Sequence, residues 1–192
     1  MSALQAVPRG WTARALGVEQ LVARARRLRA VLTDCDGVLT DGMVHASEHG
    51  EALLRFSRRD GLGVERLREA GIATAIVTRE RSPIVLRRAE KLGVPVFEGV
   101  RDKAAELPRI LAALGCARHE VAYIGDDVND LGILEAVGGE GLTAAPFDAM
   151  EPVAAVVHHV CRARGGEGAF RELAEWVLRL RRTGRNDGEE VA

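Results

Sequence analysis

Ala30-Val-Leu-Thr-Asp-Cys-Asp-Gly37 is the stretch of sequence that decides the fold. Its first four residues are short, apolar or β-branched, which predicts a buried strand over residues 30–33. Gly37 permits a sharp turn, so Asp34 and Asp36 come directly after the end of that strand. Because side chains two residues apart in an extended chain point the same way, we expect both carboxylates on one side and Cys35 in the core.

Helices and strands alternate along the chain on both sides of this stretch. Helices are predicted near residues 18–29, 61–70, 82–92, 103–115, 129–136 and 169–182, strands at 73–77, 95–97 and 120–124 with further candidates at 142–145 and 154–158, and a projecting β-hairpin over 43–57. This alternation indicates the α/β class, with a mostly parallel sheet covered by helices on both faces. In such sheets, ligands bind at the carboxyl ends of the strands.

The composition is that of a globular protein with a nearly neutral surface. The chain has 192 residues, 47% of them hydrophobic, and a net charge of −1 from 27 basic and 28 acidic residues. The length predicts a single domain over residues 18–182, preceded by an extension (1–17) and followed by a flexible tail (183–192). The balanced charge argues against a nucleic-acid partner. The absence of a long apolar run and of paired cysteine motifs argues against a membrane partner and favours the cytoplasm.

Acidic side chains gather at the predicted carboxyl ends of the strands. Asp34 and Asp36 follow the first strand, Thr78 follows the second, and Gly125-Asp-Asp-Val-Asn-Asp130 follows a later one, while Lys103 begins a helix. Aspartate and glycine are also common turn formers, but here each segment directly follows an apolar strand. Clustered carboxylates are tolerated when a cation lies among them, and oxygen ligands favour Mg²⁺.

These segments carry a resemblance to a known family. Asp34-Cys-Asp-Gly-Val-Leu-Thr-Asp-Gly42, Thr78, Lys103 and Gly125-Asp-Asp-Val-Asn-Asp130 resemble the four motifs of the haloacid-dehalogenase-like (HAD) phosphatases. The chain is more narrowly similar to the branch that includes 3-deoxy-D-manno-octulosonate 8-phosphate phosphatase and the phosphatases of nine-carbon ulosonic acids. Supporting segments are Arg59-Asp-Gly61, Arg88-Ala-Glu-Lys-Leu92 and Gly165-Gly-Glu-Gly-Ala-Phe-Arg-Glu172. The resemblance implies a Rossmann-like HAD fold without a cap domain.

The resemblance also implies a role for each motif residue. Asp34 would attack phosphorus and form an aspartyl-phosphate, and Asp36 would act as general acid and then as general base. Thr78 would hydrogen-bond the phosphate, and Lys103 would neutralise its charge. The implied ligands of Mg²⁺ are the Asp34 side chain, the Asp36 backbone carbonyl and the Asp126 side chain. Asp127 would lie near the ion without binding it directly.

The substrate implied is a 2-keto-3-deoxy sugar acid phosphate. Residues expected to contact it are Arg59, Asp60, Gly61, Glu80, Arg88 and Lys91. Glu80 stands where the octulosonate enzymes commonly have arginine. Together with Lys91 it resembles the branch that acts on a nine-carbon substrate, 2-keto-3-deoxynononate or N-acylneuraminate 9-phosphate. The alternatives are octulosonate 8-phosphate and a non-catalytic oligomerisation module. Lys91 also fits a simple helix-capping role, and Arg79, where the family has glycine, would be strained if that position needs a positive φ.

The resemblance further implies a homotetramer. With no cap domain, the hairpins of four subunits would associate, and a glycine-rich segment would help to line a neighbour's active site. Gly165, Gly166 and Gly168 fit such a close-approaching segment, although a simple turn into the last helix fits them as well.

Overall fold

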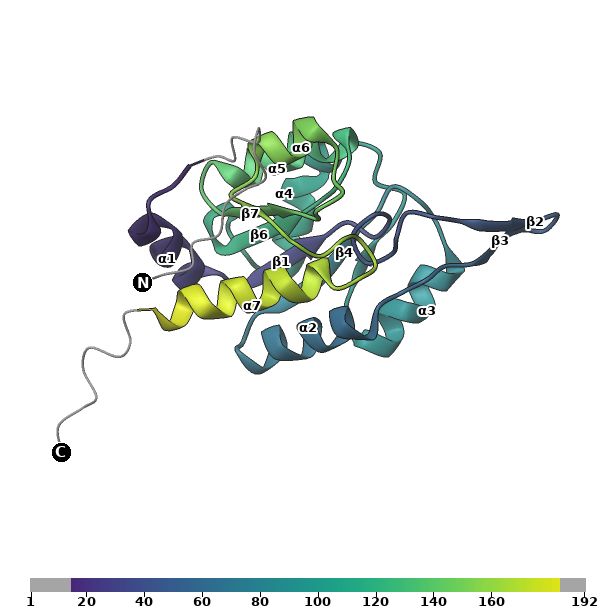
Figure 1. Ribbon diagram of the computed structural model, residues 1–192, viewed down its shortest axis with the longest axis horizontal. Helices are drawn as coiled ribbons and strands as arrows, with labels where there is room; N and C mark the ends of the chain where they lie inside the picture. The colour runs from purple at the N-terminus through teal and green to yellow at the C-terminus, as the bar shows by residue number, and fades with distance from the viewer. Residues whose placement is uncertain (1–14, 184–192) are drawn as a thin grey trace.

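A six-stranded sheet forms the centre of the protein (Figure 1). The computed structural model describes residues 15–183. The strands are β1 (Ala30–Thr33), β4 (Ala73–Val77), β5 (Val96–Phe97), β6 (Val121–Ile124), β7 (Leu142–Ala145) and β8 (His159–Val160). Their spatial order is β5-β4-β1-β6-β7-β8, and each neighbouring pair is parallel. The predicted α/β class with a mostly parallel sheet is confirmed.

Helices cover both faces of the sheet (Figure 1). On one face lie α1 (Val18–Arg27), α2 (Arg58–Glu69), α3 (Pro83–Leu92) and α7 (Ala169–Arg182), and on the other lie α4 (Lys103–Leu114), α5 (Leu131–Gly138) and α6 (Glu151–Val156). Short 3-10 helices occupy Arg118–Glu120 and Val128–Asp130. Cys35 is fully buried in the core between the sheet and the first group of helices, as expected. Among residues 15–183, no helix is long and apolar enough to cross a membrane.

A β-hairpin projects from the body of the protein between β1 and α2 (Figure 1). Its strands, β2 (His45–Ser47) and β3 (Gly50–Leu53), are antiparallel, as predicted. An isolated bridge between Thr40 and Phe56 closes the base of the hairpin beside the loop that follows β1. The hairpin therefore leaves the sheet next to the predicted catalytic residues.

Two of the predicted elements differ from the structure. Residues 154–158 do not form a strand: α6 runs through Val156, because Pro152 favours the first turn of a helix, and the strand follows at β8. Helix α2 begins at Arg58 rather than near residue 61, because the Ser57 side chain accepts a hydrogen bond from the backbone N–H of Arg59. The expected extension and tail fall, apart from residues 15–17 and 183, outside the described residues.

The strand order creates a crevice at the carboxyl ends of β1 and β6. The chain leaves β1 toward β4 and β5, but leaves β6 toward β7 and β8 on the opposite side. Connections that diverge in this way leave an opening above the two strands, which is where open α/β sheets bind ligands. Asp34 and Asp126 stand at the two strand ends that flank this opening.

Candidate active site

Lys103 is a buried cation held between two carboxylates. Its side chain is 1% exposed, and its Nζ lies 2.7 Å from Oδ2 of Asp34 and 2.7 Å from Oδ1 of Asp130. Helix α4 positions the lysine at its first residue, after Asp102 has capped the helix by accepting a hydrogen bond from Ala105. The remaining oxygen of Asp34 accepts a 2.7 Å hydrogen bond from the backbone N–H of Cys35. Both oxygens of the predicted nucleophile are thereby held in place.

Asp130 was not predicted as a site residue, yet it connects the other groups. Its Oδ1 accepts hydrogen bonds from Lys103 and, at 2.6 Å, from the hydroxyl of Tyr123, while its Oδ2 accepts one at 3.0 Å from the backbone N–H of Asp126. A Cβ on Gly125 would lie 2.3 Å from Oδ2 of Asp130. The signal available in the sequence was its place in the GDDVND motif, four residues after Asp126.

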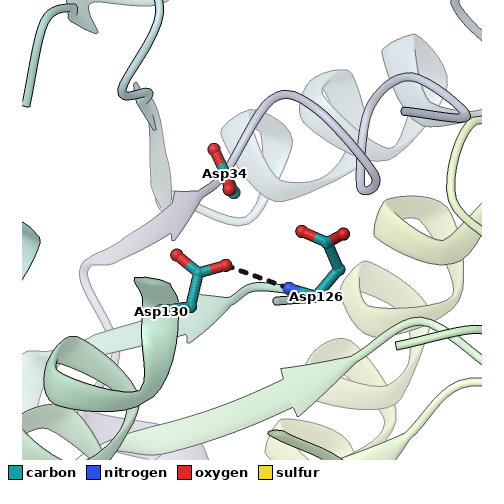
Figure 2. Close-up of side chains that lie close together, drawn as sticks. All are labelled: Asp34, Asp126 and Asp130. Atoms are coloured by element: carbon teal, nitrogen blue, oxygen red, sulfur yellow. Dashed lines mark hydrogen bonds between the residues drawn. The ribbon is translucent and has the colours of Figure 1, made fainter. Parts of the chain in front are cut away.

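Asp34, Asp126 and Asp130 converge on one small volume (Figure 2). One oxygen of each carboxylate lies within 4.8 Å of the others. Burial raises the pKa of Asp126 to about 8, and the negative charges of Asp34 and Asp130 contribute to the shift. Within residues 15–183, Asp126 forms no ion pair that would offset these effects. A divalent cation would relieve this repulsion, and the oxygen-only donor set fits Mg²⁺.

Gly37 makes room for the carboxylate of Asp126. The glycine adopts φ +76°, and a Cβ at this position would lie 1.9 Å from Oδ2 of Asp126. A side chain at residue 37 would therefore both strain the backbone and displace the acid. The predicted sharp turn is thus required by a contact as well as by the backbone conformation.

Asp36 is half-buried in the loop after β1 and is not one of the three clustered carboxylates. Its Oδ1 accepts a 3.4 Å hydrogen bond from the Thr40 hydroxyl. Burial raises the pKa of Asp36, and the hydrogen bond from Thr40 lowers it by less. The negative charges of Glu51 in the hairpin and Glu80 after β4 raise this pKa further. A carboxyl group with a raised pKa can retain a proton and donate it.

Thr78 is buried directly after β4, on the other side of β1 from Asp126. Its hydroxyl accepts a 3.2 Å hydrogen bond from the backbone N–H of Glu80. Arg79 and Glu80 are exposed. Within residues 15–183, no residue other than glycine has a positive φ, so the strain considered for Arg79 does not arise.

Two known relatives of this chain have the same description. No family model matches the sequence. The 3-deoxy-D-manno-octulosonate 8-phosphate phosphatase KdsC of Yersinia pestis is 36% identical over 161 residues, which cover 83% of this chain and 84% of that protein. The KdsC of Haemophilus influenzae is 38% identical over 156 residues, covering 81% and 85%. This chain belongs to the KdsC family of HAD phosphatases. Members of this family are phosphoric monoester hydrolases.

Two solved KdsC structures that contain a metal ion agree with this fold. The cobalt-bound H. influenzae enzyme superposes with a TM-score of 0.78 at 38% identity, covering 82% of this chain and 91% of that one. The Moraxella catarrhalis enzyme, in complex with a magnesium ion, a phosphate ion and KDO, gives 0.79 at 32% identity over 85% and 93% of the two chains. Together with the carboxylate cluster, these KdsC structures indicate Mg²⁺ as the cofactor.

Three of the residues predicted to bind substrate in this KdsC-family protein take part in helix packing. Asp60 in α2 is buried and accepts a 2.9 Å hydrogen bond from the backbone N–H of Arg171 at the start of α7. A Cβ on Gly61 would lie 3.1 Å from the guanidinium of Arg88, which donates to the Ser57 carbonyl at 3.0 Å. Arg59 is exposed beside them. Asp60, Gly61 and Arg88 thus connect α2 with α3 and α7.

The remaining predicted residues lie on the surface. Lys91 is exposed in the last turn of α3, whose cap Gly93 has φ 65°, which agrees with the helix-capping alternative. Glu80 lies in the segment between β4 and α3. Asp127 is exposed, caps the following 3-10 helix and does not belong to the carboxylate cluster. The structure therefore brings together Asp34, Asp126 and Lys103, whereas Asp127 and Lys91 stand apart.

Proposed function

We propose that this protein is a Mg²⁺-dependent phosphatase that hydrolyses 3-deoxy-D-manno-octulosonate 8-phosphate. The observation that carries the proposal is the convergence of Asp34 and Asp126 beside Lys103 in a chain whose relatives are named for this substrate. The nine-carbon substrate preferred from the sequence is set aside, because those relatives are named for the eight-carbon compound. The features that favour nine carbons are Glu80 and Lys91.

In the proposed reaction, Asp34 is the nucleophile. An oxygen of its carboxylate, held by Lys103 and the Cys35 N–H, attacks phosphorus, and the bond from phosphorus to the sugar oxygen breaks. Asp36 donates its proton to that leaving oxygen. The raised pKa of Asp36 supports this role. In the second half-reaction Asp36 takes a proton from the water that attacks the aspartyl-phosphate, and inorganic phosphate leaves.

The other residues of the site would manage charge on the phosphoryl group. When bound by Asp34, the Asp36 carbonyl and Asp126, Mg²⁺ would mask phosphate charge and orient the groups around it. The Thr78 hydroxyl would donate to a phosphate oxygen, and the Lys103 ammonium would balance negative charge on both the phosphate and Asp34. Asp127 would act outside the direct ligands, and Arg59, Glu80 and Lys91 would contact the sugar from the surface.

The proposal includes a homotetramer in the cytoplasm, formed through the hairpins. Met43, Val44 and Leu53 are 66%, 53% and 65% exposed on and beside the hairpin, as expected for a surface that packs against another subunit. The free thiols of Cys35, Cys116 and Cys161 agree with a reducing compartment. Light scattering of the full chain and of a Leu53→Asp variant tests the assembly. A charge at residue 53 should disfavour association of the hairpins, so the measured mass of the assembly should fall.

A panel of sugar phosphates tests the activity. Phosphate release is measured from octulosonate 8-phosphate, 2-keto-3-deoxynononate 9-phosphate and N-acetylneuraminate 9-phosphate, each with Mg²⁺ and with a chelator. We expect the highest kcat/KM for the eight-carbon substrate and loss of turnover without metal. A higher kcat/KM for either nine-carbon compound would reverse the substrate assignment. No release from any of them by folded, Mg²⁺-loaded protein would favour the non-catalytic module.

A further inference from the structure

The segment from Arg162 to Gly168, here called the strap, packs against the loop from Asp34 to Asp41, here called the catalytic loop. The Gly166 N–H donates a 2.9 Å hydrogen bond to the Val38 carbonyl. A Cβ on Gly165 would lie 2.0 Å from the Gly37 carbonyl oxygen. The strap thus touches the backbone of its own chain's catalytic loop. The family resemblance implies that the same segment also helps to line a neighbour's site.

The strap is held in place from its outer side by two carboxylates. Glu172 in α7 accepts hydrogen bonds from the backbone N–H groups of Arg162 at 2.9 Å and Ala163 at 3.0 Å. Asp148, in the loop after β7, accepts one from the Gly165 N–H at 3.0 Å. These hydrogen bonds fix the position of the strap relative to both α7 and β7. Because the strap contacts the catalytic loop, its position limits where that loop can lie.

An ion-paired arginine adds a second link between the strap and the catalytic loop. Nε of Arg55, at the base of the hairpin, lies 2.8 Å from Oδ2 of Asp41 in the catalytic loop, and its guanidinium also pairs with Glu167 of the strap at 3.3 Å. These groups are partly exposed, so the pairs contribute little stability. Their significance is that they join the same two segments as the glycine contacts.

The part of the catalytic loop that the strap touches is the part that holds the reactive groups. A Cβ on Gly165 would meet the carbonyls of Gly37 and Thr40, at 2.0 and 3.0 Å. Gly37 lies directly against the Asp126 carboxylate, and the Thr40 hydroxyl donates to Asp36. A shift of either carbonyl would therefore move the proposed acid and base, or the metal-binding carboxylate.

We propose that Gly165 is a positioning residue, whose lack of a side chain lets the strap set the position of the catalytic loop relative to Asp126. The inference rests on the proposed function for its effect on turnover, but its effect on metal affinity does not depend on which sugar phosphate is hydrolysed. Contacts one layer outside a metal site typically change metal affinity or activity by about 10–100-fold when removed.

The test compares Gly165→Ala with Gly139→Ala. Gly165 does not have a positive φ, so alanine there adds a steric contact without backbone strain. Gly139 has helical φ −60° and its nearest neighbouring atom would be 4.0 Å away, so alanine fits there. Mg²⁺ affinity is measured by titration calorimetry, kcat and KM by phosphate release, and folding by circular dichroism.

We expect Gly165→Ala to weaken Mg²⁺ binding and lower kcat by about tenfold or more, with Gly139→Ala within about twofold of wild type. Wild-type Mg²⁺ affinity and kcat in folded Gly165→Ala, with only a lower unfolding temperature, would overturn the proposal. If the wild type hydrolyses no sugar phosphate but Gly165→Ala still weakens Mg²⁺ binding, the positioning role stands and the proposed function fails.

A milder pair of variants keeps the proposal testable if Gly165→Ala does not fold. Asp148→Ala removes the acceptor of the Gly165 N–H, whereas Asp148→Asn retains an acceptor oxygen. We expect Asp148→Ala to weaken Mg²⁺ binding and Asp148→Asn to restore it. Equal, wild-type affinity in both variants would overturn the proposal.

Discussion

The carboxylate of Asp126 occupies the space that a side chain on Gly37 would need. A Cβ on Gly37 would lie 1.9 Å from Oδ2 of Asp126, although the two residues follow different strands, β1 and β6. Because these strands are neighbours and parallel, their carboxyl ends meet at one edge of the sheet. The glycine of the first motif and the acid of the last are therefore parts of one packing arrangement.

Gly37→Ala should abolish metal binding, whereas Gly71→Ala should only reduce stability. Both glycines have positive φ, +76° and +74°, so alanine strains the backbone in each by about 1–2 kcal/mol. At Gly71 an added Cβ meets nothing within 4 Å, but at Gly37 it displaces Asp126. Mg²⁺ titration and thermal unfolding of both variants separate the two effects. Equal Mg²⁺ affinities would show that the Asp126 contact is unimportant.

Asp34→Asn should reduce kcat by at least about 10³-fold while leaving the fold and assembly intact. The amide is nearly isosteric with the carboxylate and can still accept the Cys35 N–H, but it is a poor nucleophile for phosphorus. The measurements are phosphate release, circular dichroism and light scattering. Retained turnover would remove Asp34 from the nucleophile's role.

Asp130→Asn should impair both stability and turnover, because it alters three contacts at once. Lys103, Tyr123 and the Asp126 N–H all donate to this carboxylate. Loss of a charged hydrogen-bond partner in the interior costs about 1–3 kcal/mol, and we expect kcat to fall about 10–100-fold. Tyr123→Phe, which removes one of these hydrogen bonds, is the control. Identical stability and kcat in the two variants would contradict a connecting role for Asp130.

Asp60→Asn should change how stability depends on pH. Burial raises the pKa of Asp60 to about 6, although the hydrogen bond from Arg171 opposes the shift, and its Oδ2 has no partner among residues 15–183. Between about pH 4 and pH 6 the unfolded chain loses this proton while the folded protein keeps it, so stability falls as pH rises, by at most about 1.4 kcal/mol per pH unit.

Asparagine at residue 60 removes this dependence but keeps an oxygen for the Arg171 N–H. Urea unfolding at pH 4, 5, 6 and 7 should show the asparagine variant gaining stability relative to wild type as pH rises. The exposed Glu65 of the same helix, changed to glutamine, is the control. A constant difference between Asp60→Asn and wild type would refute the raised pKa.

Glu80→Arg should increase the preference for the eight-carbon substrate over the nine-carbon ones. Glu80 is exposed near Asp36, and arginine at this position restores the residue that the octulosonate enzymes commonly have. The ratio of kcat/KM values is the measurement, and Glu98→Arg, an exposed acid after β5, is the control. An unchanged ratio would exclude Glu80 from substrate selection.

The strand ends were the most predictable part of this protein. Apolar runs that end in polar residues predicted β1, β4 and β6, and the parallel topology then required Asp34 and Asp126 to meet. Residues 154–158 were predicted wrongly, because a short apolar run reads alike as a buried strand or a helix, and here Pro152 favours a helix.

The roles of Asp60 and Asp130 depend on contacts between distant parts of the chain, which the sequence alone does not show. Asp60 stands in a segment that carries the family resemblance and is a predicted substrate contact. In the structure α7 also packs against α2, and the backbone N–H of Arg171 donates to the Asp60 carboxylate. Asp130 was visible within its motif, yet its role depends on Lys103 and Tyr123, which reach it from α4 and β6. Neither partner can be identified from local spacing.

The contact of Gly165 with Gly37 has a consequence for biosynthesis. A ribosome releases residues 34–41 before residues 162–168, so the catalytic loop emerges without the segment that packs against it. Until that segment follows, the loop lacks the hydrogen bond from the Gly166 N–H to the Val38 carbonyl. A chain cut short before residue 162 is therefore expected to have a less ordered loop after β1, even where β1 pairs with β4 and β6.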